Sequence, residues 1–479
     1  MVPQARLIEL AAPGDWTGAK LSPMSQPPSH NRPHTLAHHG RSILALGLPL
    51  IANNLATAGM GFTDTVMAGQ LGGHALAAVA IGNTLWYTAH LAGMGVLMAV
   101  SPLVAHALGA DQPERIGGLV RQSFWIALFL GLLGLFLLNL SAPFFLAVGV
   151  DPEVVPTSAR YLSAIAWGLP AVLGYLCLRF MSEGMGHTRP LMFFALLGLV
   201  VNAAGNYVLM YGKLGFPALG AVGCGVATAI TTWTLLLVSL MYVRRSSRYK
   251  AVQLKPLLLR PRWQAIKEIL RLGVPISASA LAESTFFHAT ALIMAALGTA
   301  IVAAHQVALN YAATMFMVPL ALHSATTVRV GHLLGRGLPR DARRAGLAGI
   351  AISTLFMGVS AVVMYLGRFA IAGFYTTDTT VINLAASLLV MAAVFQLPDG
   401  VNIATLGALR GYRDARVPFY LAVFSSWGVG FPLAWYLAFR TDQGPQGVWF
   451  AIVISLVLAA GLQVWRFLEI SRRGLAGTE

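Results

Sequence analysis

Three acidic side chains lie well inside long apolar stretches of the chain: Asp64, Glu283 and Asp399. They are the only ones placed in this way among 17 Asp and Glu residues. A carboxylate inside a bilayer is unfavourable unless it faces a polar cavity, binds a cation or takes up a proton, so such residues mark ion or substrate pathways. The three acids are therefore the candidate cation and proton sites, and they point to transport.

The composition is that of an all-α polytopic membrane protein. Of 479 residues, 57% are hydrophobic and 10% are charged, and the mean hydropathy is +0.70. The net charge of +15 does not indicate nucleic-acid binding, because basic residues gather in the cytoplasmic loops of membrane proteins. No Gly-x-x-x-x-Gly-Lys motif is present, so ATP-driven transport is not supported, and no organic cofactor is expected. Cys177 and Cys224 lie in apolar runs and are expected to be packing residues.

Apolar stretches long enough to span a bilayer recur from Ile43 onward, since about twenty residues are enough for one helix. Twelve transmembrane helices are predicted. Their approximate ranges are 43–70, 76–108, 118–147, 156–182, 190–212, 217–243, 268–297, 300–334, 342–374, 380–409, 416–439 and 446–470.

The two halves of the chain resemble each other, with an offset of 226 to 228 residues. The matched positions are Leu46-Gly47-Leu48-Pro49 with Leu272-Gly273-Val274-Pro275, Leu71-Gly72 with Leu297-Gly298, Ala77-Ala78 with Ala303-Ala304, Asn83 with Asn310, His106 with His332, Gly109 with Gly335, Gly184 with Gly411, and Pro190 with Pro418. Six helices per half make the repeats parallel, which is typical of transporters whose halves rock about a central site. The three acids have no acidic counterpart in the other half, which favours a functional origin for them.

The domain organisation follows from this repeat. We predict a disordered cytoplasmic tail at 1–40, an N-lobe at 41–245, a cytoplasmic linker at 246–266, a C-lobe at 267–472 and a short tail at 473–479.

The distribution of basic residues predicts cytoplasmic N- and C-termini. With this orientation the cytoplasmic side holds Arg115, Arg121, Arg189, the run from Arg244 to Arg271, the run from Arg336 to Arg344 and the run from Arg410 to Arg416; the opposite side has little beyond Arg160, Lys213, Arg368 and Arg440.

Several long segments resemble a known family. They are Gly59-Met60-Gly61-Phe62-Thr63-Asp64, Tyr211-Gly212-Lys213-Leu214-Gly215-Phe216-Pro217, Gly223-Cys224-Gly225-Val226-Ala227-Thr228, the run from Val302 to Asn310, and Leu409-Arg410-Gly411-Tyr412-Arg413-Asp414. In order and spacing these segments resemble the multidrug and toxic compound extrusion (MATE) transporters, NorM branch. The resemblance covers about Ile43 to Arg472.

The resemblance implies a monomeric antiporter of the bacterial inner membrane that exports small cationic drugs or dyes in exchange for Na⁺ or H⁺. It assigns proton or drug coupling to Asp64 and a C-lobe cation site to Glu283 and Asp399. Asn202 and Asn206 match asparagines near the first-helix acid. The family often has Pro between these asparagines, whereas this chain has Ala203-Ala204. The sequence therefore leaves undecided whether this helix is kinked.

A further group of aromatic, amide and methionine side chains could contact a drug, because such surfaces adapt to varied ligands, or could be ordinary helix packing. Its members are Phe286, Phe287, Gln306, Asn310, Tyr311 and Met315.

Two other functions are alternatives to antiport. A lipid-linked precursor flippase of the same superfamily would require a basic cavity for phosphates, whereas this chain places acids in its spans. An intramembrane aspartyl protease could use Asp64 and Asp399 as its pair, but the Gly-x-Gly-Asp and Tyr-Asp motifs are absent and the duplication would be unexplained.

Overall fold

The computed structural model describes residues 35–147, 149, 151–252, 254 and 260–476, and the regular elements in these ranges are all helical. The first half comprises α1 (Leu36–Gln70), α2 (Gly73–Leu97), α3 (Val100–Gly109), α4 (Pro113–Asn139), α5 (Ser141–Ala147), α6 (Val155–Ala166), α7 (Leu169–Gly184), α8 (Arg189–Tyr211), α9 (Ala221–Arg245) and the 3₁₀-helix η1 (Ser247–Val252). The second half comprises α10 (Trp263–Leu297), α11 (Thr299–Gly335), α12 (Pro339–Tyr375), α13 (Thr379–Gly411), α14 (Arg416–Val423), the π-helix η2 (Phe424–Gly430), α15 (Phe431–Phe439) and α16 (Gly444–Ala476).

The membrane spans agree with the predicted twelve. Among the described residues, 11 helices are long and apolar enough to cross a bilayer, and the bent pair α6–α7 makes up to 12. This pair bends by 41° at its break. Pro170, in the first turn of α7, explains the break, because it has no N–H to donate to the preceding turn.

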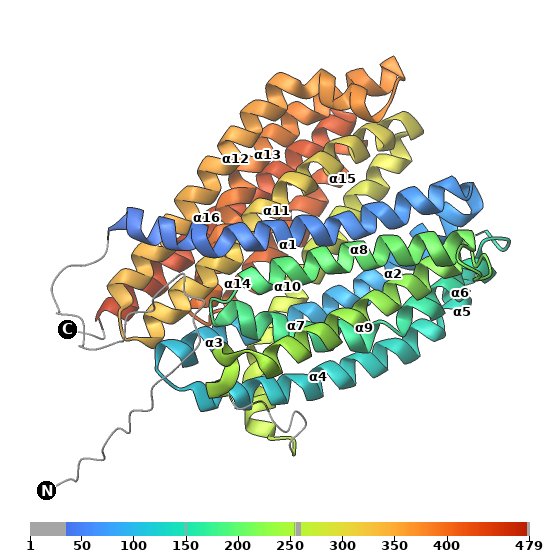
Figure 1. The fold of residues 1–479 in the computed structure, drawn as a ribbon. Coiled ribbons are helices and arrows are strands. Elements are labelled where there is room, and N and C mark those ends of the chain that lie inside the picture. Colours follow the sequence, from blue (N-terminus) through green and yellow to red (C-terminus); the bar gives the residue numbers. More distant parts are fainter. Residues whose placement is uncertain (1–34, 148, 150, 253, 255–259, 477–479) are drawn as a thin grey trace, which may run out of the picture. The chain divides into compact units, whose positions relative to one another are not determined.

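Each half has its own hydrophobic core. One large cluster lies almost wholly in α1–α9, and a second, with Trp449 at 0% exposure, joins α10–α13, α15 and α16. Figure 1 shows α1 lying between α8 of its own half and α11 of the other half. We call α1–α9 the N-lobe and α10–α16 the C-lobe.

The predicted boundaries need three corrections. Residues 1–34 lie outside the described residues, but the helix begins at Leu36, so residues 36–40 are not a disordered tail. The Thr35 hydroxyl caps this helix by accepting from the His38 N–H at 3.3 Å, and His39 is buried with its Nε2 at 3.6 Å from Asp341 Oδ1. The linker is also partly helical, since η1 occupies 247–252 and α10 begins at Trp263, and α16 extends to Ala476.

The η1 segment is packed against the N-lobe and is not a free loop. Burial raises the pKa of the Tyr249 phenol to about 12, so the phenol stays protonated and its hydroxyl donates to Ser182 Oγ at 2.9 Å. The Tyr249 ring also contacts His187, with 5.4 Å between centroids. These contacts fix the start of the linker beside the end of α7.

Candidate functional site

The N-lobe carboxylate is held by side chains from two further helices. The Asn206 amide on α8 donates to Asp64 Oδ1 at 2.6 Å, and the Thr228 hydroxyl on α9 donates to Oδ2 at 3.4 Å. Asn202 donates to the Thr228 hydroxyl at 3.3 Å. The structure therefore brings together Asp64, Asn202 and Asn206, as predicted, and adds Thr228. The helix α8 runs without a break past Ala203-Ala204, so the two asparagines share one face at i, i+4 spacing.

This group can accept a small cation. The side-chain oxygens of Asn202 and Asn206 are buried and have no partner among the described residues, and both side chains are at most 1% exposed. Na⁺ is a hard cation, and carboxylate and amide oxygens are the ligands that hard cations prefer. Asp64 itself is half-buried. The oxygens present therefore fit Na⁺, and the carboxylate alone fits a proton.

The C-lobe acids are less well partnered. Glu283 on α10 is half-buried and Asp399 on α13 is 4% exposed, and they lie close enough for their charges to interact. Neither carboxylate forms a hydrogen bond or an ion pair within 4.0 Å with another described residue. Two neighbouring acids that accept no hydrogen bond from the described residues are stabilised by a shared cation or by a bound proton.

Two amides on the same face of α13 extend this site. Gln396 and Asn402 lie three residues on either side of Asp399, and each is at most 6% exposed. Their Oε1 and Oδ1 atoms have no partner among the described residues. Neither residue is among the predicted site residues, although their spacing of three residues on either side of Asp399 in an apolar run was a usable signal. The C-lobe thus offers a second oxygen-rich site that fits a small cation.

A π-helix lies beside Glu283. In η2, the Trp427 indole N–H donates to the Ala282 carbonyl at 2.9 Å, next to Glu283 in the chain. Such π-helical segments occur frequently at functional sites. The sequence predicted one regular span over 416–439, because a π-helix of seven residues is too short to give a recognisable periodic pattern.

The proposed drug-contact residues are separated by the fold. Phe286 is only 3% exposed and belongs to the C-lobe core, so it is a packing residue and not a cavity residue. Phe287 is half-buried against Phe395, with 6.2 Å between ring centroids. On α11, Gln306 and Asn310 are exposed, whereas Tyr311 and Met315 are half-buried.

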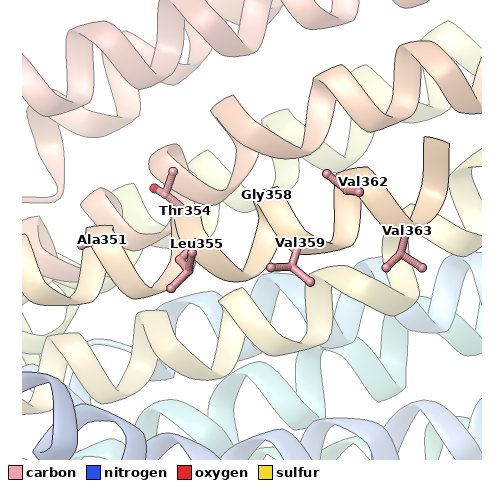
Figure 2. A pocket seen from close by; sticks show the side chains of 7 residues that line it. All are labelled: Ala351, Thr354, Leu355, Gly358, Val359, Val362 and Val363. Carbon is pink, nitrogen blue, oxygen red and sulfur yellow. The ribbon is translucent and has the colours of Figure 1, made fainter. Parts of the chain in front are cut away.

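One hollow of about 700 Å³ lies on α12 and contains no acid. Figure 2 shows Leu355, Val359, Val362 and Val363 projecting from this helix. These four side chains are between 53% and 70% exposed, as expected for a face that contacts lipid. This hollow is therefore separate from both acidic sites.

A fourth acid, Glu183, lies inside an apolar helix, so the prediction that only three do is wrong. The helix α7 extends through Glu183, which is 2% exposed, one residue beyond the predicted end of that span. Ser101 on α3 donates to its Oε1 at 3.3 Å, and Oε2 has no partner among the described residues. Arg410 is likewise not a loop residue, since it lies in α13 and is half-buried. Burial against the other lobe, which the sequence does not reveal, accounts for both errors.

The lobes meet in a reciprocal contact near these residues. His106 Nε2 of the N-lobe bonds to the Gly411 carbonyl of the C-lobe at 2.7 Å, and His332 Nε2 of the C-lobe bonds to the Gly184 carbonyl of the N-lobe at 2.8 Å. Between them Gly109 and Gly335 pack backbone against backbone. We call these six residues the seam. The repeated motifs His-x-x-Gly and Gly184/Gly411 are therefore explained by a pseudo-twofold contact.

Comparison with known proteins identifies a family model and close relatives. The model described as MatE matches residues 49–208 and 275–436, that is, one copy in each half. The "Probable multidrug resistance protein NorM" of Xanthomonas campestris pv. campestris is 44% identical over 90% of this chain and 94% of its own length. "Multidrug resistance protein PmpM" of Pseudomonas aeruginosa is 42% identical over 90% of this chain and 92% of its own. Among solved structures, that of the "eukaryotic MATE transporter AtDTX14" matches with a TM-score of 0.83, at 18% identity, over 92% of this chain and 98% of that one.

Proposed function

Because this chain belongs to the MatE family of membrane transporters, which are not enzymes, we propose that it is a multidrug efflux antiporter that exports cationic, partly apolar compounds in exchange for Na⁺ or H⁺. The names of relatives at 44% and 42% identity over nearly their whole length support drug export. We further propose that it acts as a monomer in a bacterial inner membrane with both termini in the cytoplasm, as the basic loops favour.

The proposed coupling of ion entry to drug exit is supported by two oxygen-rich acidic sites, one in each lobe. Each site combines a carboxylate with buried amide side chains whose oxygens have no partner among the described residues: Asn202 and Asn206 in the hydrogen-bonded group of Asp64, and Gln396 and Asn402 three residues on either side of Asp399 on α13. An acid in this setting is stabilised by binding H⁺ or Na⁺, and a cationic drug can take the place of either. That competition links entry of the ion to exit of the drug.

Alternating access gives drug transport its direction. A ligand shifts the equilibrium between two conformations by the difference in its affinity for them. In the proposed orientation with cytoplasmic termini, the ends of α3 and α11 that form the seam face the cytoplasm, and we infer that a closed seam seals the transporter on that side. Opening of the seam would then admit drug from inside.

The available energy is sufficient. One unit of pH gradient provides about 1.4 kcal/mol per proton, and about 100 mV of membrane potential adds roughly 2.3 kcal/mol per charge moved. A one-for-one exchange of an ion for a monovalent drug cation moves no net charge, so the ion gradient alone drives it, and the membrane potential contributes only when more ions enter than drug cations leave.

Reconstituted protein tests this function. Efflux of ethidium from proteoliposomes is measured with a pH gradient and a Na⁺ gradient imposed separately, in the presence and absence of an ionophore that dissipates each gradient. We expect one of the gradients to drive efflux above the level of protein-free vesicles. Efflux under neither gradient would contradict antiport and favour the flippase alternative, which is then assayed with a fluorescent lipid-linked phosphate.

The N-lobe site allows the coupling ion to be identified. In Asn206→Leu, Asp64 loses its 2.6 Å hydrogen bond and the site loses one amide oxygen. If Na⁺ is the coupling ion at Asp64, we expect the half-saturating Na⁺ concentration for efflux to rise roughly tenfold, because the loss of one oxygen ligand to the cation costs about as much as a hydrogen bond to a charged group, about 1.5 kcal/mol. If H⁺ is the ion, the half-saturating proton concentration should fall, because the charged carboxylate has lost a donor. Asn139→Leu on α4, whose amide donates to the Leu135 carbonyl, serves as the control. No change relative to this control would show that Asp64 does not take part.

A further inference from the structure

A hollow of about 480 Å³ lies where the start of α10 and the α13–α14 connection approach α3. Three apolar side chains, each at most 6% exposed, line part of it: Leu103, Leu272 and Ala415. Leu103 comes from α3, one turn before His106 of the seam, so residues of both lobes contribute to the lining. This volume is within the range of about 300–1,000 Å³ that is typical of ligand pockets.

Four basic and two acidic side chains also line this hollow, which we call the basic hollow: Lys267, Arg271, Arg413, Arg416, Glu268 and Asp414. Both acids are already paired. Glu268 contacts Arg115, outside the lining, at 2.8 Å and Arg413 at 3.7 Å. Asp414 contacts Arg466, also outside the lining, at 2.7 Å. The negative charges of the lining are therefore compensated.

Three of the basic side chains have no such partner. Lys267, Arg271 and Arg416 are exposed, and none of them forms a hydrogen bond or an ion pair with another residue that the structure describes. Lys267 and Arg271 share one face of α10 at i, i+4 spacing. Basic residues that only orient a chain in the membrane need not converge on one hollow. The convergence of these three, next to apolar side chains, favours a ligand that has both an anionic and an apolar part.

Exposed aromatic side chains place the basic hollow at the level of lipid headgroups. Trp263 lies one turn before Lys267 on α10, Tyr420 lies one turn after Arg416 on α14, and each ring residue is 68% exposed. Tryptophan and tyrosine gather at the membrane–water interface. In the orientation proposed above, this is the cytoplasmic interface, where anionic lipids attract basic segments.

We propose that the basic hollow binds the headgroup of an anionic phospholipid, and that it prefers a headgroup with two phosphates to one with a single phosphate. Three unpaired cations suffice to form charge-assisted contacts with two phosphates. The apolar lining receives the upper part of the acyl chains, which a free phosphate lacks. The proposal uses the cytoplasmic orientation of the termini but does not depend on antiport.

Lipid binding is measured by native mass spectrometry on delipidated protein in detergent. The probes are tetraoleoyl cardiolipin, with two phosphates, dioleoylphosphatidylglycerol, with one, and the zwitterionic dioleoylphosphatidylcholine. We expect affinity to fall in this order. Each basic residue near an anionic lipid strengthens binding about fivefold, which corresponds to about 1 kcal/mol. The triple variant Lys267→Gln/Arg271→Gln/Arg416→Gln should therefore raise the Kd for cardiolipin roughly a hundredfold.

A matched control removes the same charge from the same side of the protein. Arg244→Gln/Arg245→Gln/Lys250→Gln changes three exposed basic residues at the end of α9 and in η1, none of which lines the basic hollow. It should change the Kd for cardiolipin less than about twofold. Equal weakening by the two triple variants would show that the lipid is attracted by diffuse charge, and would overturn the proposal.

A single substitution guards against misfolding. Gln264 is exposed, lies in the first turn of α10 and lines the basic hollow, and an acidic residue is favourable at the start of a helix. Gln264→Glu should therefore keep the unfolding temperature while raising the Kd for cardiolipin about fivefold. An unchanged Kd in this folded variant would contradict binding in the basic hollow.

Competition distinguishes a lipid from a soluble phosphate compound. Inorganic phosphate or glycerol phosphate, added at a hundredfold excess over cardiolipin, should leave the bound lipid in place, because neither contacts the apolar lining. Displacement of cardiolipin by either compound would assign the basic hollow to a soluble phosphate ligand and overturn the lipid assignment. Equal affinity for cardiolipin and phosphatidylglycerol would overturn the preference for two phosphates.

Discussion

Replacing Glu283 or Asp399 by the neutral amide should abolish ion-driven drug accumulation. In Glu283→Gln and Asp399→Asn the shape of each side chain is nearly kept, but the charge that would bind H⁺ or Na⁺ is gone. An electroneutral one-for-one exchanger can sustain about a tenfold drug gradient per unit of pH gradient, because that unit provides about 1.4 kcal/mol. For both variants we expect this ratio to fall to about one.

The measurement is the steady-state ratio of ethidium across proteoliposomes at a fixed pH or Na⁺ gradient, with thermal unfolding of each variant as the test of folding. We expect the unfolding temperature to be kept, since neither carboxylate has a hydrogen-bond partner among the described residues to lose. Asp442→Asn, an exposed acid between α15 and α16, is the matched control and should transport normally. A full gradient in both amide variants would rule out coupling at the C-lobe site.

A single methyl group at the seam should force the lobes apart. In Gly109→Ala the new Cβ would lie 2.3 Å from the His332 carbonyl oxygen, and in Gly335→Ala it would lie 2.3 Å from the His106 carbonyl oxygen. The clash is with backbone of the other lobe, which cannot rotate away as a side chain can. Overpacking costs about 1–3 kcal/mol, which corresponds to roughly a 5- to 150-fold shift away from the closed seam.

Spin labels attached at Gln112→Cys and Arg336→Cys, exposed positions next to the seam, in a Cys177→Ala, Cys224→Ala background report this shift as a change in their distance distribution by pulsed electron resonance. Efflux should fall because one of the two states becomes rare. Gly118→Ala on α4 is the control, since a Cβ there meets no atom within 4 Å. If Gly109→Ala and Gly335→Ala both leave the distance distribution like that of Gly118→Ala, the seam is not the contact that opens.

Local features of the chain were sufficient to predict the spans and one part of the site. Twelve apolar stretches with polar breaks correspond to the helices α1–α16, because the bilayer demands apolar length and satisfied backbone groups irrespective of packing. Asn202 and Asn206 share a helix face by spacing alone, and the structure joins Asn206 to Asp64 as expected. The breaks at Ala166–Leu169 and at η2 were not predicted, since both depend on how neighbouring helices pack.

The sequence by itself determined the membrane class, the duplication and the acids that have no counterpart in the other half. Only the tertiary structure decided that Glu183 is buried, that Phe286 is a core residue, that Gln396 and Asn402 are buried on either side of Asp399, and that Arg410 in α13 contacts His323. The physical reason is the separation along the chain of the residues that determine each feature. Hydropathy, helix periodicity and an internal repeat are properties of neighbouring residues or of a fixed offset, whereas burial and side-chain contacts where the lobes meet depend on residues that are distant in the chain and come together only after folding.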